Sequence, residues 1–106
     1  MKNDTSDAFK LFPTAAPAHA RAWFDAIRGL GTASALDPRT SALAYLAVLA
    51  AMRLESGIPF HVAQARAAGA TREEVISAIL VGLPAAGNAV ISVLPVALEA
   101  FDQSSS

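Results

Sequence analysis

The chain of 106 residues is rich in apolar residues (54%) and poor in charged ones (16%), with a formal net charge of −1. At this length a single domain is expected. The eight Lys and Arg residues form no basic stripe, which argues against a nucleic-acid partner. The absence of cysteine excludes disulfides, thiolate zinc sites and cysteine redox chemistry within the chain. Since there are also only two histidines, no metal or other cofactor is expected.

The apolar excess has to be buried, either in a membrane or between subunits. Residues 79–100 are long enough for a membrane span, but glycine, proline, asparagine and glutamate interrupt them. We therefore expect buried helices there, no membrane partner, and a homo-oligomer whose interface includes this C-terminal region. The first residues are polar and acidic where a signal peptide would be apolar, so a cytoplasmic location is expected.

Residues 1–11 have mixed charge and little periodicity, and we expect them to form an N-terminal arm. A first helix should follow, with Thr14 as its cap and Pro17 in its first turn, and should end at Gly29 and Gly31. Its apolar stripe has helical spacing and comprises Trp23, Phe24, Ile27 and Leu30. Such a stripe is typical of core residues, so Trp23 is expected to pack rather than to contact a ligand.

Asp37 followed by Pro38 is a typical helix start, with the acid as cap and the proline in the first turn. Residues 42–52 carry no charge, and a helix that is apolar on every side is expected to be buried on every side. Tyr45 supplies the only polar group in this run. A break at residues 56–59 leads into an antiparallel partner helix, predicted over residues 60–68 and ended by Gly69.

Thr71 and Glu74 have the spacing of a capping box, which predicts a further helix start. Pro84 then starts or kinks the last element and Pro95 is expected to bend it. The buried side of this element should comprise Val90, Ile91, Leu94, Leu98 and Phe101. No stretch indicates a strand. We predict an all-α, single-domain antiparallel helical bundle over residues 12–102, with about five main helices and a polar tail over residues 103–106.

Several of these segments occur together in one order: Leu36-Asp37-Pro38-Arg39-Thr40, an alanine-rich helix, His61 with Gly69 eight residues later, Ala70–Val75, and Ala97–Phe101. In this combination the stretch from residue 36 to residue 102 resembles the carboxymuconolactone decarboxylase family, which includes the alkyl hydroperoxidase D proteins. The resemblance implies the all-α fold of the hydroperoxidase D type and assembly as a trimer or hexamer.

In the hydroperoxidase branch of that family, a Cys-x-x-Cys pair precedes the histidine and a glutamate lies one helix earlier. Counted from His61, the cysteine positions fall on Leu54 and Gly57, and the glutamate position falls on Ala42. Peroxide chemistry of this kind requires a thiolate that attacks the substrate. Leucine and glycine supply none, so thiol peroxidase activity is not expected.

The decarboxylase branch uses no cysteine. The segment Gly82–Ala89 resembles its Gly-Val-Pro-Ala-Ala-Asn-His-Ala segment, with Gly87 in the asparagine position and Asn88 in the second histidine position. His61 corresponds to the first histidine of that branch. An asparagine can hydrogen-bond a substrate oxygen but cannot transfer protons near neutral pH.

The candidate catalytic residue is His61, and the candidate binding residues are Asn88, Glu55, Arg53 and Tyr45. At a helix start the dipole should lower the pKa of His61. Four of the five have a structural alternative: a packed and hydrogen-bonded histidine, an asparagine that caps a helix, a solvated glutamate and a core tyrosine. His19 is expected to be exposed and without a role.

Two functions remain open. The first is a non-redox enzyme, lyase-like, that binds a small carboxylated or lactone metabolite and uses His61 as acid or base. The second is a non-catalytic oligomeric binding or scaffold protein that has kept the fold and lost the ancestral chemistry. An enzyme should have an enclosed pocket onto which His61 and Asn88 converge with their polar ends free, whereas a scaffold should hold His61 packed and hydrogen-bonded, with no cavity beside it.

Overall fold

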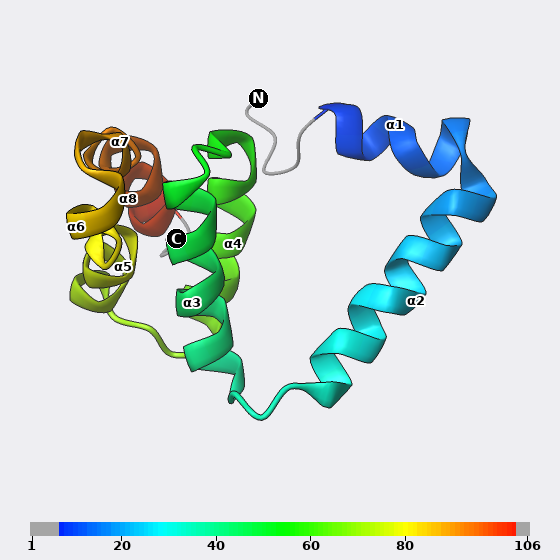
Figure 1. The fold of residues 1–106 in the computed structure, drawn as a ribbon, viewed down its shortest axis with the longest axis horizontal. Coiled ribbons are helices and arrows are strands. Elements are labelled where there is room, and N and C mark those ends of the chain that lie inside the picture. The colour runs from blue at the N-terminus through cyan, green and yellow to red at the C-terminus, as the bar shows by residue number, and fades with distance from the viewer. Residues whose placement is uncertain (1–6, 104–106) are drawn as a thin grey trace.

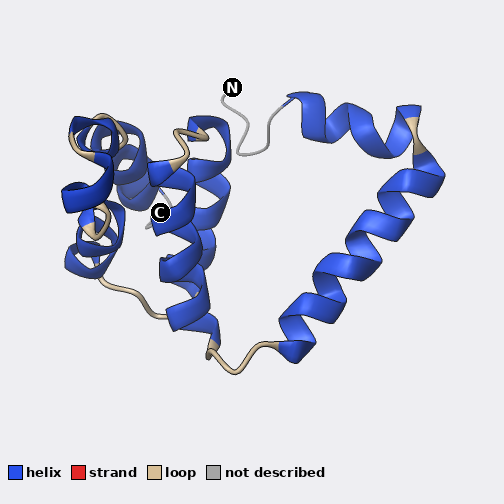
Figure 2. Cartoon of the chain, viewed as in Figure 1, coloured by secondary structure: helices blue, strands red, loops and turns tan. Residues whose placement is uncertain are grey.

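The computed structural model describes residues 7–103, and within this range the chain forms helices and no strand, as Figure 2 shows. The elements are α1 (Asp7–Ala15), α2 (Pro17–Ala33), α3 (Pro38–Ala51), η1 (Glu55–Gly57), α4 (Ile58–Ala67), α5 (Arg72–Leu80), α6 (Leu83–Ala86), α7 (Asn88–Ile91) and α8 (Leu94–Gln103). The predicted all-α class is confirmed. None of these helices has both the length and the hydropathy needed to cross a membrane.

The described residues divide into two parts (Figure 1). We call residues 38–103, which comprise α3 to α8, the body, and residues 7–33, which comprise α1 and α2, the N-terminal helix pair. In the body α3 and α4 lie side by side, and α5 and α8 pack against them. The helix pair diverges from α3 at a short linker and stands away from the body.

The core lies in the body. Its twelve buried residues come from α3, α4, α5 and the C-terminal segments: Leu46, Leu49, Ala50, Ile58, Val62, Ala65, Ala70, Val75, Ile79, Val90, Val93 and Ala97. Most of them are fully buried, and a buried Leu, Ile or Val side chain stabilises the fold by roughly 1.5–3 kcal/mol. This core fixes how α3 and α4 lie against each other, and therefore which side chains face each other across that pair.

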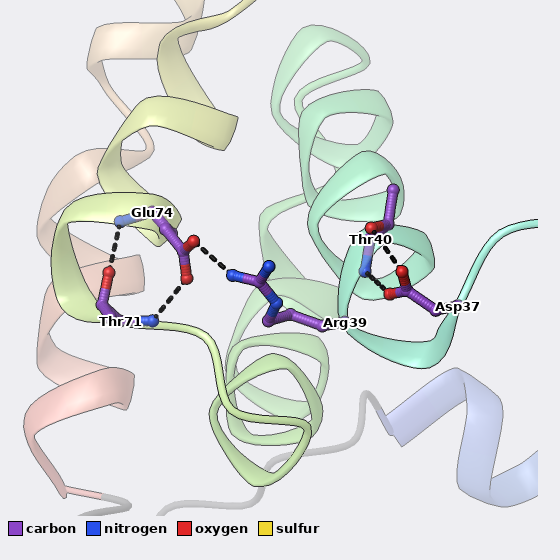
Figure 3. A network of polar contacts seen from close by, with 5 residues as sticks. All are labelled: Asp37, Arg39, Thr40, Thr71 and Glu74. Atoms are coloured by element: carbon purple, nitrogen blue, oxygen red, sulfur yellow. Dashed lines mark hydrogen bonds and ion pairs between the residues drawn. The ribbon is translucent and has the colours of Figure 1, made fainter.

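Two helix starts are linked by a polar network at one end of the body, shown in Figure 3. Asp37 caps α3 by accepting from the Thr40 N–H at 2.8 Å, and Thr71 caps α5 in the predicted capping box with Glu74. The Glu74 carboxylate also pairs with Arg39, whose guanidinium holds the pKa of Glu74 below its usual value. The sequence predicted both caps but not the ion pair that joins α3 to α5.

Two helices of the body end in the same hydrogen-bond pattern. After α4, Gly69 lies in the left-handed region at φ 99°, and the Ala70 N–H donates to the Ala65 carbonyl at 3.0 Å. After α3, the Leu54 N–H donates to the Leu49 carbonyl at 2.9 Å, but the left-handed residue is Arg53, at φ 59°. A side chain in this conformation costs roughly 1–2 kcal/mol relative to glycine.

The N-terminal region differs from the prediction. Residues 7–11 belong to α1, Ala16 rather than Thr14 occupies the cap of α2, and α2 continues through Gly29 and Gly31 to Ala33. Pro17 is in the first turn of α2, as predicted. The remaining residues of the predicted arm and tail, 1–6 and 104–106, lie outside the described range. Thr14 lies within α1 and caps no helix, because α1 continues to Ala15 and only Ala16 separates it from α2.

Three predictions of burial are wrong. Trp23 is 54% exposed, because α1 covers only the part of α2 near Ala20 and Phe24. The helix predicted to be buried on every side, α3, leaves Tyr45 and Val48 about half exposed. Ile91, predicted on the buried side of the last element, is 43% exposed. That element is divided into α6, α7 and α8, so Pro95 lies in the first turn of α8 and does not bend a helix.

Candidate functional site

His61 lies in the first turns of α4, on the side that faces α3. Its imidazole is half-buried, with the ring of Tyr45 on α3 at a centroid distance of 4.6 Å. The ring of Phe60 meets it edge-on at 5.1 Å. The antiparallel packing of α3 and α4 thus brings together two of the candidate residues, His61 and Tyr45, from positions 16 apart in the sequence. Phe60 was expected only to pack.

The imidazole of His61 makes no hydrogen bond with any residue in the range 7–103. Burial lowers its pKa below the ordinary value of 6.5, because the charged form is penalised when water is removed. The direction agrees with the prediction, but the cause is burial and not the helix dipole. The side chain is therefore neutral at pH 7, with both ring nitrogens available to a substrate. The structural alternative of a hydrogen-bonded histidine is wrong.

The turn before α4 contains Leu54 and Gly57, the positions at which the resemblance to the hydroperoxidase branch would place two cysteines. A Cβ atom built on Gly57 would lie 3.9 Å from Cδ2 of His61 and 3.7 Å from Cδ1 of Leu49. These are ordinary contacts, and Gly57 has a φ of −89° that any residue adopts. The second cysteine position is therefore adjacent to the histidine, and in this chain it carries no side chain.

Arg53 and Glu55 flank this turn and are both exposed. Neither makes an ion pair or a hydrogen bond through its side chain with another described residue. The strained backbone of Arg53 fixes the direction in which its side chain leaves the helix end. The guanidinium of Arg53 and the carboxylate of Glu55 are therefore two groups of opposite charge, unpaired within residues 7–103, eight and six residues before His61.

Asn88 is the first residue of α7 and is exposed. Gly87 occupies the cap of α7 and no side chain caps that helix, so the alternative role of Asn88 as a helix cap is wrong. α7 packs against α3 and α5. The amide of Asn88 makes no hydrogen bond with His61 within the described chain.

The face around His61 is apolar and open to solvent on one side. Tyr45, Leu54 and Phe60 are 48%, 47% and 41% exposed. A separate shallow hollow lies in the N-terminal helix pair, and its lining comprises Phe12, Ala16, His19, Ala22 and Trp23. His19 is exposed there, as predicted. Across residues 7–103 no three His, Asp or Glu side chains are grouped closely enough to hold a metal ion.

The polar network of Figure 3 explains which part of the sequence carries the family resemblance. Asp37, Arg39, Thr40, Thr71 and Glu74 all belong to two of the segments on which that resemblance rests, residues 36–40 and 70–75. Their contacts cap and join α3 and α5, so they stabilise the fold. The chemistry of the site depends on other residues, above all His61.

Comparison with protein families confirms the resemblance. Residues 17–99 match the model of the carboxymuconolactone decarboxylase family. Comparison with curated proteins and with solved structures gave no match. The matched range includes α2, which the resemblance noted in the sequence did not cover.

Proposed function

Because the chain belongs to the carboxymuconolactone decarboxylase family, we propose that it is a cysteine-independent enzyme acting on a small carboxylated or lactone metabolite. The observation that carries the proposal is the state of His61. Its imidazole is half-buried, neutral at pH 7 and free of hydrogen bonds with described residues, and it lies against Tyr45. No side-chain nitrogen or oxygen in the described range is both buried and unpartnered, so the ring nitrogens of His61 stay accessible to a substrate from the solvent side.

The chemistry proposed for His61 is proton transfer. In decarboxylation the neutral imidazole takes the proton of the substrate's carboxyl group, the C–C bond breaks with release of carbon dioxide, and the electron pair left on the carbon takes the proton back from the imidazolium. In lactone opening the imidazole takes a proton from the attacking water, and the imidazolium returns it to the ring oxygen as the C–O bond breaks. Because burial disfavours the imidazolium, it is a stronger acid than in water, which favours the second step. No thiol takes part, since the chain has no cysteine.

The binding residues proposed around His61 are Arg53, Asn88, Tyr45 and Glu55. Arg53 is the best candidate to bind a substrate carboxylate, because its guanidinium is exposed and has no acidic partner among the described residues. The Tyr45 hydroxyl and the Asn88 amide are candidates to hydrogen-bond a developing oxyanion. Glu55 would stabilise the imidazolium form if its carboxylate turned toward the ring.

A second candidate function is a non-catalytic oligomeric binding or scaffold protein. It is favoured by the residues at the family's reactive positions, since Leu54 and Gly57 provide no reactive group and Asn88 is exposed. Under this alternative His61 only fills space between α3 and α4, and its replacement by a residue of similar size would leave every measured property unchanged apart from stability.

The variant His61→Gln separates the two functions, because glutamine retains a polar side chain but cannot titrate. The purified protein is assayed for carbon dioxide release and ring opening on a panel of lactones and β-keto acids. We expect His61→Gln to lower kcat/KM at least about 100-fold, the usual contribution of general acid–base catalysis. The matched control is His19→Gln, which removes the other histidine and should leave kcat/KM unchanged. Equal turnover in both variants would exclude catalysis by His61.

We also propose that the protein is a homo-oligomer, a trimer or hexamer. The support is the exposure of large apolar side chains on the surface of the single chain, including Val81 at 68%, Leu83 at 36% and Ile91 at 43% near α6 and α7. Analytical ultracentrifugation measures the mass directly. A monomer at micromolar concentration would contradict the proposal.

A further inference from the structure

The N-terminal helix pair has almost no core of its own. Over residues 7–33 only Ala20 is buried, at 3% exposure, and the ring contacts of Phe24 with Phe9 and Phe12 are its main packing. Helices of this length are marginal in water without tertiary packing on an apolar face. The helix pair therefore requires a partner surface that the described part of the chain does not give it.

The uncovered face of α2 is a continuous apolar stripe. Trp23, Ile27 and Leu30 follow one another at spacings of four and three, so they lie on one side of the helix. They are 54%, 44% and 71% exposed. Phe9 and Leu11 on α1 are also exposed, at 43% and 61%.

The body has an uncovered apolar face of the same kind. Tyr45, Val48 and Met52 lie on one side of α3 at spacings of three and four, and they are 48%, 50% and 63% exposed. Leu54 and Phe60 extend this face at the turn and at the start of α4. α5 and α8 pack against α3 and α4, and in Figure 1 the helix pair lies on the other side of α3 and α4 from α5. We call the exposed residues Tyr45, Val48, Met52, Leu54 and Phe60 the α3–α4 face.

The linker between the two parts has an extended conformation in this structure. Ser34 has an extended backbone at ψ 139°, and its hydroxyl accepts from the Leu36 N–H at 3.1 Å. Asp37 then caps α3. To lay α2 on the α3–α4 face of its own chain, the backbone of this linker would have to change. A second copy can receive the helix pair without any such change.

From these observations we infer that the N-terminal helix pair of one chain docks on the α3–α4 face of a second copy, and that the exchange is reciprocal. Each chain carries both halves of the contact, which is the condition for a two-fold symmetric interface; of the two proposed assemblies, the hexamer contains two-fold related pairs and the trimer does not. With roughly 200 Å² of surface per large residue, the ten exposed side chains of the helix pair and the α3–α4 face present on the order of 1,000 Å² per chain. Two reciprocal contacts bury at most about 2,000 Å², the area of a stable interface.

The same docking closes the open side of the candidate site. Tyr45 belongs to the α3–α4 face and lies 4.6 Å, centroid to centroid, from His61. A helix pair laid across that face covers Tyr45 and places the stripe of Trp23 over the entrance to His61. The docking does not depend on catalysis, whereas its role in enclosing a substrate rests on the proposed function.

Trp23 is the only tryptophan in the chain, so its fluorescence reports the docking in the unmodified protein. On dilution from micromolar to nanomolar concentration, we expect the emission maximum to move to longer wavelength as Trp23 becomes exposed. The midpoint should coincide with dissociation measured by ultracentrifugation. A blue-shifted emission that does not change on dilution would indicate folding back within one chain and would overturn the inference. A red-shifted emission at every concentration would overturn it as well.

Crosslinking tests which chain receives the helix pair. Because the chain has no natural cysteine, only the introduced cysteines react with the crosslinker. The single variants Ile27→Cys and Val48→Cys carry different tags, are mixed, and are treated with a short bis-maleimide. We expect a crosslinked pair that contains both tags. The control mixture replaces Val48→Cys by Ser77→Cys, an exposed position on α5. Overturning results are equal crosslinking in the control, or crosslinking only within the single chain of a double Ile27→Cys, Val48→Cys variant.

The variant Trp23→Lys tests the energetics, and Lys10→Ala on α1 is its control. Because tryptophan is a typical hot-spot residue, we expect the dissociation constant of the oligomer to rise roughly 30-fold or more, with the helical content of the body retained. An unchanged dissociation constant would overturn the docking. If the dissociation constant of the oligomer rises as expected while no variant, including His61→Gln, affects turnover, the docking stands and the proposed enzyme function fails.

Discussion

The body and the N-terminal helix pair contain the same kind of apolar stripe, and only in the body is that stripe covered. In α4 and α5 the stripe residues Ile58, Val62 and Val75 are fully buried, whereas in α2 the stripe residues Trp23 and Leu30 are 54% and 71% exposed. The pattern in the sequence is equivalent in both places. What differs is whether another segment of the same chain lies against it. An apolar stripe thus predicts a helix that needs a partner, and it does not predict where the partner comes from.

The largest expected effect comes from shortening one apolar side chain in each of the two parts and comparing the loss of stability. Ile58→Ala removes a fully buried side chain from the core of the body and should lower the free energy of unfolding by about 2–5 kcal/mol. Trp23→Ala removes a larger side chain that is half exposed in the single chain. At a protein concentration below the dissociation constant of the oligomer, urea unfolding should show that Trp23→Ala changes the free energy of unfolding of the body by less than about 0.5 kcal/mol. A similar loss in both variants would show that the helix pair packs on its own body.

A smaller effect compares two glycines within the body. Gly69 has a φ of 99°, so Gly69→Ala forces a side chain into the left-handed region and should destabilise the protein by roughly 1–2 kcal/mol. Gly57 has a φ of −89° and ordinary contacts around a new Cβ, so Gly57→Ala should stabilise it by about 0.4–1 kcal/mol. Thermal unfolding followed by circular dichroism measures both. If Gly57→Ala destabilises, the space beside His61 is smaller than these contacts imply.

The smallest effect concerns pH and the site in the body. The pKa of His61 lies below 6.5 in the folded protein because of burial, so the unfolded chain binds the proton more tightly. The stability contributed by neutral His61 is fully present above pH 6.5 and is lost as the pH falls through that value toward the folded pKa. NMR titration of the His19→Gln variant leaves His61 as the only histidine and gives its pKa directly. A value at or above 6.5 would contradict the burial of the ring.

The features that sequence alone predicted are those that depend on neighbouring residues. Asp37 caps α3, Thr71 and Glu74 form the capping box of α5, and Gly69 ends α4, because in each case the hydrogen-bonded groups are within five residues of one another. The same local geometry allowed Arg53 to take the left-handed position after α3, which no rule based on residue type would have indicated.

The candidate site was predicted only in part for a related reason. His61 was identified from its place in the motif, but its contact with Tyr45 arises from the packing of α3 on α4. Tyr45 itself was expected in the core, and Asn88 was expected to be buried or to cap a helix, yet both are exposed. The ion pair of Arg39 with Glu74 joins residues 35 positions apart, so no local pattern could reveal it.

The sequence by itself therefore determined the helical class, the main helix starts and stops, the family, and the absence of thiol chemistry. These follow from composition, from caps that close within a turn, and from motifs read along the chain. Only the tertiary structure decided which apolar faces are buried, that His61 is half-buried without a hydrogen bond beside Tyr45, and that α2 stands away from the body. Burial depends on what distant segments lie against a side chain, and that is a property of the packed molecule.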